Sequence, residues 1–245
     1  MIDVRWLWVF LDEPAPDFEE SMAFWAAMTS TTPSPRRGED GQFLTLLPDA
    51  GDAWIKMQAT GVGQGIHLDF DVDDVHEAAD VATGLGARRI GAIGDTVVLM
   101  RSPGGFGYCF TTTGTPRTQA RETGRDLVDQ VCLDLPADVA DAERTFWADL
   151  TGWPMVQVAA RPEFHVMTRP DGIPVRLMLQ TRQTGGRNVT GHVDLACSDR
   201  AATVQRHLAA GATVVGDGPR WTVLTDPVGR TYCATDRDPG TGLLP

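Results

Sequence analysis

GIHLDFDVDDVHEAADVATGLGARRIGAIGDTVVLMRSPGGFGYCF, residues 65–110, is the stretch that decides the fold. It returns near the C-terminus as GHVDLACSDRAATVQRHLAAGATVVGDGPRWTVLTDPVGRTYCA, residues 191–234. The matches, at a shift of 125 or 124 residues, are His67 with His192, Asp69 with Asp194, Tyr108 with Tyr232 and Cys109 with Cys233. One structural unit is therefore used twice.

The segments upstream of these stretches repeat as well. VFLDEPAPDFEESMAFW, residues 9–25, overlays VCLDLPADVADAERTFW, residues 131–147, at a shift of 122 residues. The chain is thus a tandem duplication of a module of about 110 residues. We expect the two modules to span residues 1–115 and 125–240, joined by a polar linker over 112–126.

Hydrophobic periodicity predicts the order of elements in each module. Alternating apolar and polar residues predict strands, and apolar residues at helical spacing predict helices. In the first module the expected strands are 5–12, 43–47, 53–59, 66–72, 88–90, 96–101 and 107–111, with helices at 17–27 and 75–85. In the second they are strands 128–135, 154–158, 163–168 and 175–181, a helix at 139–150 and a loop at 183–188. Each module thus contains two units of a strand, a helix and three strands, and the fourth unit of the chain covers 192–235. The tail, 236–245, is expected to fray.

Composition excludes several classes of function. The formal net charge of −12 argues against nucleic acid or an anionic membrane surface as a partner, since both require a basic face. The chain contains no apolar run long enough for a transmembrane helix, and its first residues lack the features of a signal peptide, so we expect a cytoplasmic protein. The four scattered cysteines are then expected to be reduced thiols.

Three motifs recur at equivalent places in the two modules. They are Phe-Trp near the first helix, a Gln followed by His-x-Asp at the junction between units, and a closing G-A…P-x-G-x-x-Y-C strand. Together they resemble the vicinal oxygen chelate superfamily, which includes glyoxalase I, the bleomycin-resistance proteins and the extradiol dioxygenases. The resemblance implies an α+β fold in which each module pairs two βαβββ units into a half-open β-barrel cup.

Strand alternation indicates which side chains face the cups. In residues 66–70 the apolar side chains should pack under the helix, which turns His67 and Asp69 inward. His192 and Asp194 follow by the same argument. An imidazole beside a carboxylate is suited to acid/base catalysis, and the alternative is a structural histidine inherited with the strand.

The resemblance also implies where a metal ion would bind. Family members that use a metal ion bind it through His, Gln or Glu side chains on the first and last strands of paired units. The ligand on the last strand is typically Glu. Here that last-strand position holds Cys109 or Cys233. Where a His is expected, the first strand offers Trp8 or Phe10 in the first module and Gln130 or Cys132 in the second. We therefore expect no metal and no other cofactor; the remaining possible set is Cys132, Gln180, His192 and Cys233.

Several further side chains are candidates for ligand contact. Tryptophans on strands can stack on a planar ligand, whereas Trp25 and Trp147, on the helices, are expected in the core. Lys56 is either a partner for an acidic ligand or a solvated lysine at the rim. The full set of ligand-binding candidates is Trp8, Trp54, Lys56, Gln58, Cys109, Gln130, Arg176, Gln180, Trp221 and Cys233.

These observations lead to three hypotheses about function. The first is binding of a small planar molecule, aromatic or polyketide-like, with metal-independent acid/base chemistry of the isomerase, cyclase or lyase type. The second is sequestration of a drug or metabolite without turnover, and the third is a metal-dependent lyase or dioxygenase. The sequence leaves open which cup is active and whether the chain is a monomer or a homodimer.

Overall fold

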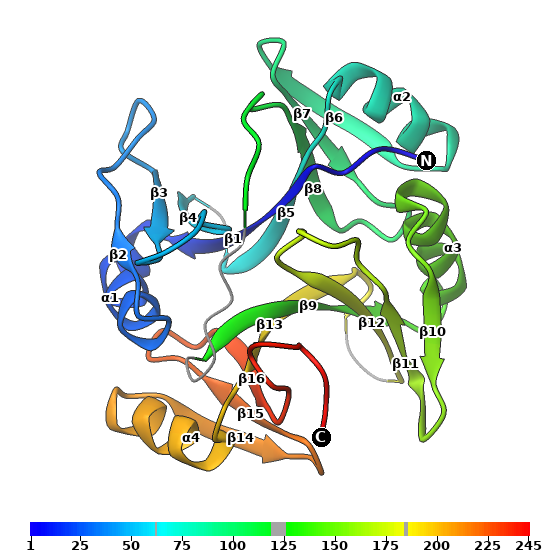
Figure 1. The fold of residues 1–245 in the computed structure, drawn as a ribbon. Coiled ribbons are helices and arrows are strands. Elements are labelled where there is room, and N and C mark those ends of the chain that lie inside the picture. Colours follow the sequence, from blue (N-terminus) through cyan, green and yellow to red (C-terminus); the bar gives the residue numbers. More distant parts are fainter. Residues whose placement is uncertain (62, 119–125, 184–185) are drawn as a thin grey trace. The chain divides into compact units, whose positions relative to one another are not determined.

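The computed structural model describes residues 1–61, 63–118, 126–183 and 186–245. Its described strands form two eight-stranded sheets, and neither closes into a barrel (Figure 1). The strand orders are β2-β3-β4-β1-β5-β8-β7-β6 and β10-β11-β12-β9-β13-β16-β15-β14, the same order twice. The predicted α+β class and tandem duplication are confirmed, while parts of the predicted linker and of the loop at 183–188 lie outside the described residues.

The elements of the first sheet follow the predicted order closely. They are β1 (Trp6–Pro14), the short 3₁₀ helix η1 (Ala15–Asp17), α1 (Phe18–Met28), β2 (Thr32–Pro33), β3 (Phe43–Leu47), β4 (Ile55–Thr60), β5 (Gly65–Asp71), α2 (Val75–Gly84), β6 (Arg88–Ile93), β7 (Val97–Arg101) and β8 (Gly107–Thr111). Those of the second are β9 (Leu127–Pro136), α3 (Ala140–Thr151), β10 (Met155–Val158), β11 (Arg161–Met167), β12 (Arg176–Arg182), β13 (Thr190–Ala196), α4 (Arg200–Ala209), β14 (Thr213–Asp217), β15 (Trp221–Thr225) and β16 (Thr231–Thr235).

The repeated residues at the ends of α2 and α4 explain why these helices recur. Asp74 caps α2 by accepting hydrogen bonds from the backbone N–H groups of His76 and Glu77, and Asp199 caps α4 through Ala202. After the helices, Gly86 and Gly211 have φ angles of +99° and +96°, which glycine adopts without strain. The same capping and turn chemistry is therefore encoded twice.

The prediction of a frayed tail was wrong for its first residues. Arg237 is 4% exposed and pairs with the buried Asp129, while Asp236 forms an ion pair with Arg200 at 2.8 Å. Asp238 then closes a turn by accepting from the backbone N–H and the hydroxyl of Thr241. Two charged residues that look solvent-bound in the sequence are held by partners far away in the chain.

Contacts group the chain into two compact units, each built from both modules. The first comprises Met1–Phe10, Ile66–Arg117 and Cys132–Gly191. In its core, Phe70 on β5 stacks on Trp147 of α3, with ring centroids 5.8 Å apart. Trp147 also donates to the buried Glu143, which accepts a second hydrogen bond from the backbone N–H of Gly104. A helix of the second module thus packs on strands of the first.

The second compact unit comprises Leu11–Gly65, Thr118–Val131 and His192–Pro245. Its core repeats the pattern with the roles of the modules exchanged. Trp25 on α1 packs edge-to-face on Tyr232 of β16, with centroids 5.1 Å apart, and its Nε1 donates to Asp226 at 2.9 Å. Both helix tryptophans, Trp25 and Trp147, are fully buried, as predicted.

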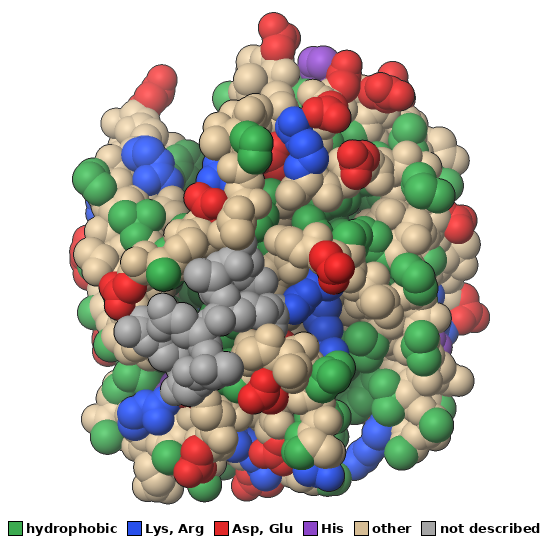
Figure 2. Space-filling view, in the orientation of Figure 1, with side chains coloured by type: hydrophobic (Ala, Val, Ile, Leu, Met, Phe, Trp, Pro, Cys, Tyr) green, Lys and Arg blue, Asp and Glu red, His purple; other side chains and the backbone are tan. Residues whose placement is uncertain are grey.

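Acidic and basic side chains are scattered among polar and hydrophobic ones on the face shown in Figure 2. Acidic groups are scattered over the face shown in Figure 2, in keeping with the formal net charge of −12. No helix in the described part of the chain is both long and apolar enough to cross a bilayer.

Candidate functional site

The first candidate cluster lies in the first compact unit. His67 and Asp69 are two residues apart on β5, so their side chains share one face of the sheet. Cys109 joins them because β8 runs parallel to β5 with Cys109 opposite Asp69. The Nε2 of His67 lies 3.7 Å from the Oδ1 of Asp69, and the ring of Phe10 stacks on the imidazole at 4.3 Å.

The second candidate cluster has the same design in the second unit. His192 and Asp194 share a face of β13, and Cys233 on the parallel strand β16 lies opposite Asp194. His192 Nε2 is 3.4 Å from Asp194 Oδ1. The side chain of His192 is 14% exposed and that of Asp194 is 3% exposed, so solvent reaches the imidazole while the carboxylate lies behind it.

A buried polar network holds the Asp194 carboxylate in place. Gln130 on β9 donates from its side-chain amide to Asp194 Oδ2, and Arg237 Nη1 lies 3.8 Å from the same oxygen. Arg237 in turn makes two hydrogen bonds to the carboxylate of Asp129. Since Gln130, Asp129 and Asp194 are each at most 2% exposed, the network fixes one carboxylate oxygen and directs the other toward His192.

The thiol of Cys233 is poorly suited to act as a nucleophile. Burial raises its pKa above the ordinary value, and the nearby Asp194 carboxylate adds to the effect, while His192 acts in the opposite direction. A protonated, buried thiol is a packing group with weak hydrogen-bonding capacity. The four cysteines are free, in line with the prediction of reduced thiols.

The remaining predicted residues divide between the two units. Lys56 and Gln58 are partly exposed on β4, where they alternate with the buried Ile55 and Met57. Arg176 and Gln180 are partly exposed on β12, and the Cys132 thiol donates to Gln180 Oε1 at 3.7 Å. Ligand contact by these four side chains stays a prediction.

The strand tryptophans are less open than the sequence suggested. Trp8 is 4% exposed and lies under the guanidinium of Arg117 at 4.5 Å. Trp54 is 5% exposed and donates from Nε1 to the carbonyl of Val128 at 2.9 Å. Trp221 is the more accessible of the three, and it lies on β15, which pairs with β16, the strand that carries Cys233.

Trp221 and the second cluster occupy one face of the sheet. On β15, Thr222 and Leu224 are buried, whereas Trp221 and Val223 are partly exposed. Val223 lies directly opposite Cys233, so it shares the face that carries Cys233 and Asp194, and Trp221 is two residues away on that face. Trp221 lies opposite Thr235 on β16. In the first module the equivalent residue is Val97, which lies opposite Thr111 on β8.

Sequence reasoning missed Arg237 and Asp129. The available signal was Asp129 itself, a carboxylate near the start of the mostly apolar strand β9, because a charge in such a strand requires a buried partner. The sequence gives no indication that this partner is Arg237, 108 residues later.

The glyoxalase-like domain profile matches residues 8–111 and again 130–235. The chain belongs to the glyoxalase-like domain family. It is therefore a member of the vicinal oxygen chelate superfamily with two tandem glyoxalase-like domains. No curated protein matches it.

Solved structures with this fold have diverse activities. A Mn(II)-bound glyoxalase from Novosphingobium aromaticivorans has a TM-score of 0.68 at 16% identity, with 100% of this chain and 87% of that chain covered. An extradiol ring-cleaving dioxygenase from B. fuscum has a TM-score of 0.66 at 17% identity, covering 99% and 74%. A mutant of 4-hydroxymandelate synthase from Streptomyces coelicolor has a TM-score of 0.59 at 15% identity, covering 98% and 94%. At these identities the likeness shows the fold of the two glyoxalase-like domains alone.

Proposed function

We propose that this glyoxalase-like protein binds a small planar organic molecule and transfers a proton on it without a metal ion. His192 and Asp194 form the acid/base pair. The observation that carries the proposal is the buried Asp194 carboxylate, held by Gln130 and Arg237 with its other oxygen 3.4 Å from a solvent-reachable imidazole.

The arrangement supports a simple division of roles. In the tautomer that carries its proton on Nε2, 3.4 Å from Asp194 Oδ1, Nδ1 of His192 has the lone pair that accepts a proton from the substrate. The imidazolium that results is stabilised by the adjacent carboxylate, and it returns the proton at another atom of the substrate. Such a step moves a proton between two positions, as isomerisation, cyclisation and elimination reactions require.

Trp221 supports a planar, aromatic or polyketide-like substrate. Its indole shares the face of His192 and Asp194 and lies level with Ala196, four residues along β13 from His192. An extended conjugated molecule stacked on it would have to reach roughly 13 Å along the strand to contact the imidazole. The first module has Val97 at this position, and its His67 is covered on one side by Phe10. We therefore assign catalysis to the second module and a supporting role to the first.

The test begins with a fluorescence screen of hydroxylated mono- and bicyclic aromatic compounds. For the compound bound best, His192→Ala should lower turnover at least 100-fold and change affinity less than about threefold, since a positioned general base contributes 10² to 10⁴ in rate. Trp221→Ala should weaken affinity about tenfold. His67→Ala is the matched control and should leave both quantities within about threefold.

Other outcomes of the same experiment contradict the proposal. If the wild-type protein binds the compound tightly, forms no product and loses affinity in Trp221→Ala, it is a sequestering protein. If His67→Ala and His192→Ala lower turnover equally, the assignment to the second module is wrong.

One observation favours a second candidate, a metal-dependent enzyme. The donor atoms of His192, Asp194 and Cys233 lie within 4.8 Å of one another, and those of His67, Asp69 and Cys109 do the same. A divalent ion bound there would act as a Lewis acid. Two features of the second cluster oppose a cation, however: Arg237 is 3.8 Å from Asp194, and burial raises the pKa of Cys233, although binding needs a thiolate.

Metal content separates the two candidates. We expect protein purified without chelator to contain well under one metal ion per chain by elemental mass spectrometry. We also expect no rise in Tm on addition of zinc, nickel, manganese or iron(II). About one ion per chain, with a rise in Tm that His192→Ala abolishes, would favour the metal-dependent enzyme instead.

A further inference from the structure

Strand β12, in the first compact unit, carries polar side chains on the face that does not pack against a helix. Leu179 is fully buried, whereas Gln180 and Arg182 are partly exposed. Thr181 shares the face of Leu179 and accepts a hydrogen bond from Arg144 of α3 at 2.7 Å, so that face lies against the helix. Because side chains alternate along a strand, Gln180 and Arg182 both belong to the opposite face.

The guanidinium of Arg182 has no partner among the described residues. Its Nε is shielded from solvent and makes no hydrogen bond, and no described carboxylate forms an ion pair with the group. Glu163, on the neighbouring strand β11, lies 3.6 Å from Arg161 instead. A partly buried cation without a partner is costly, since water is withdrawn from an N–H group and nothing replaces it. An anion bound to Arg182 would remove this cost.

The side-chain amide of Gln180 adds further donors on the same face. The thiol of Cys132 donates to Gln180 Oε1 at 3.7 Å, which fixes the oxygen end of the amide toward β9. The Nε2 end is then directed away from the thiol, and no described residue accepts a hydrogen bond from it. Gln180 and Arg182 thus offer N–H groups from two positions roughly 7 Å apart along the strand.

Apolar side chains of β11 lie next to these donors. Strand β11 runs antiparallel to β12 (Figure 1), with Phe164 opposite Gln180 and Val166 opposite Met178. Residues directly opposite each other share a face of the sheet, so the phenyl ring lies beside the amide. Phe164 and Val166 are both partly exposed. An aromatic ring next to N–H donors suits a flat apolar ligand that ends in a hydrogen-bond acceptor.

The donor chemistry selects a carboxylate as that acceptor. The planar guanidinium of Arg182 matches the two oxygens of a carboxylate, and the Gln180 amide can donate to one of them. A guanidinium offers only donors, so an amine or another cation is repelled at this position. The chain carries a formal net charge of −12, so binding of an anion depends on the local charge of Arg182 and not on the protein as a whole.

We propose that this face of β11 and β12 binds an aromatic carboxylate. The guanidinium of Arg182 pairs with the carboxylate, Gln180 Nε2 donates to one of its oxygens, and the ring of the ligand packs against Phe164. None of these three residues takes part in the proposed proton transfer, so the site stands or falls separately from the proposed function.

Benzoate is the probe, with benzamide as its neutral analogue and acetate as a carboxylate without a ring. Binding is followed by NMR through the Nε–H resonance of Arg182, which is assigned by its loss in Arg182→Met. The proton resonances of benzoate report its binding to variants that lack this group. We expect a saturable shift with benzoate and at least about tenfold weaker binding of benzamide and of acetate.

Arg182→Met tests the charge. It should weaken benzoate binding at least about tenfold and change the weaker binding of benzamide less than about threefold. Tm should stay the same or rise, because the variant removes a partly buried cation that has no partner. Lower affinity without lower stability excludes unfolding as the cause. Arg88→Met, at an exposed position on β6 with the same change of charge, should leave benzoate binding unchanged.

Two further variants test the other contacts. Phe164→Ala should weaken benzoate binding several-fold and leave acetate binding unchanged, because only benzoate has a ring to pack against the phenyl group. Gln180→Met keeps the size of the side chain and removes its N–H donors, so it should weaken the binding of both carboxylates several-fold.

The proposal is overturned if benzoate gives no saturable shift of the Arg182 resonance. Equal binding of benzamide, or unchanged benzoate affinity in Arg182→Met, would also overturn it, because the face would then bind aromatic rings regardless of charge. Full benzoate affinity in both Phe164→Ala and Gln180→Met would place the ligand elsewhere and contradict the assigned site.

Discussion

Arg237 connects two buried carboxylates, and its loss should be costly. It is 4% exposed and pairs with Asp129 while lying close to Asp194. Arg237→Met leaves both charges buried without their cation, which we expect to lower the free energy of unfolding by about 3 to 5 kcal/mol. Urea unfolding measures the change.

A matched surface arginine serves as the control for this prediction. Arg220, whose side chain is 50% exposed, lies 3.9 Å from Asp236, and Arg220→Met should change the free energy of unfolding by less than about 0.5 kcal/mol. A loss below about 1 kcal/mol in Arg237→Met would mean that the network does not hold Asp194 as described.

His207 should make stability depend on pH. It is fully buried, with Nδ1 2.7 Å from the Tyr232 hydroxyl and its ring against Phe24, and burial lowers its pKa from 6.5 to about 4. At pH values between about 4 and 6.5, His207 is protonated in the unfolded chain and neutral in the folded chain. The free energy of unfolding should therefore fall by roughly 3 kcal/mol as the pH drops from about 6.5 to 4.

The contribution of His207 is isolated by comparison with His207→Gln. Asp126 and Arg206 act on the His207 pKa in opposite directions and are present in both proteins. Denaturant unfolding at several pH values should show a smaller slope in His207→Gln, whereas His76→Gln, at a partly exposed position, should keep the wild-type slope. Parallel curves for wild type and His207→Gln would contradict the assignment.

At the scale of elements, the turn between β7 and β8 approaches α3 very closely. A Cβ atom added at Gly104 would lie 2.6 Å from Val189 Cγ2 and 3.0 Å from Glu143 Oε1. Gly104→Ala should therefore lower the free energy of unfolding by about 1 to 3 kcal/mol through overpacking. Thermal or urea unfolding tests this expectation.

A second glycine separates crowding from backbone effects. A Cβ atom added at Gly61 would have nothing within 4 Å, so Gly61→Ala should be neutral or slightly stabilising. Equal effects at Gly104 and Gly61 would show that the turn tolerates a methyl group and that Glu143 is not held against it.

At the scale of the whole molecule, the two modules depend on each other for their cores. Each compact unit contains segments of both modules, and Trp147 of the second module stacks on Phe70 of the first. We expect residues 1–115, expressed alone, to lack a folded monomeric core. The measurement is circular dichroism and thermal unfolding of this fragment, alone and mixed with residues 125–240.

The outcome distinguishes two views of the duplication. Cooperative unfolding that appears only on mixing would show that the cores need both modules. A monomeric fragment 1–115 that unfolds cooperatively by itself would show that the module boundaries proposed from the sequence are also folding boundaries.

The sequence by itself determined the fold class and most of the element order. The repeats at 65–110 and 191–234 carry the same caps, Asp74 and Asp199, and the same turn glycines, so local chemistry fixes each helix twice. Strand alternation likewise placed His67 and His192 on one face with their carboxylates, since a period of two needs no knowledge of distant partners.

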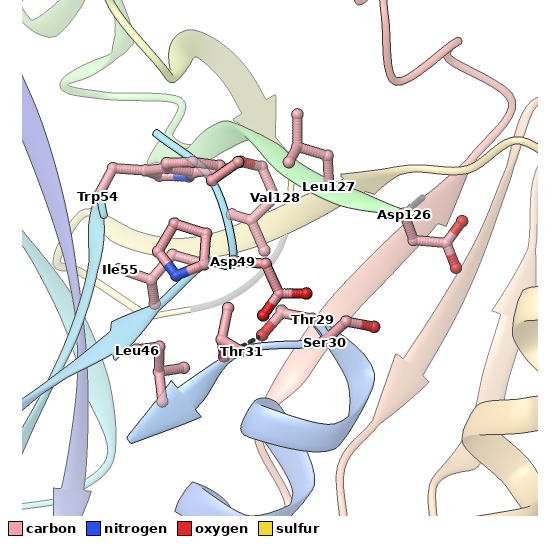
Figure 3. A pocket seen from close by; sticks show the side chains of 12 residues that line it. Thr29, Ser30, Thr31, Leu46, Asp49, Trp54, Ile55, Asp126, Leu127 and Val128 are labelled. Carbon is pink, nitrogen blue, oxygen red and sulfur yellow. Dashed lines mark hydrogen bonds between the residues drawn. The ribbon is translucent and has the colours of Figure 1, made fainter. Parts of the chain in front are cut away.

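Only the tertiary structure decided which groups meet across the chain. Arg237 pairs with Asp129, 108 residues away in the chain, and Trp25 donates a hydrogen bond to Asp226, 201 residues away. No local sequence pattern encodes such pairings. Trp54 is likewise buried against a distant segment, since its indole donates to the Val128 carbonyl, 74 residues later (Figure 3). The physical reason is that periodicity and capping act within a few residues, whereas the satisfaction of buried charges depends on how the completed elements pack.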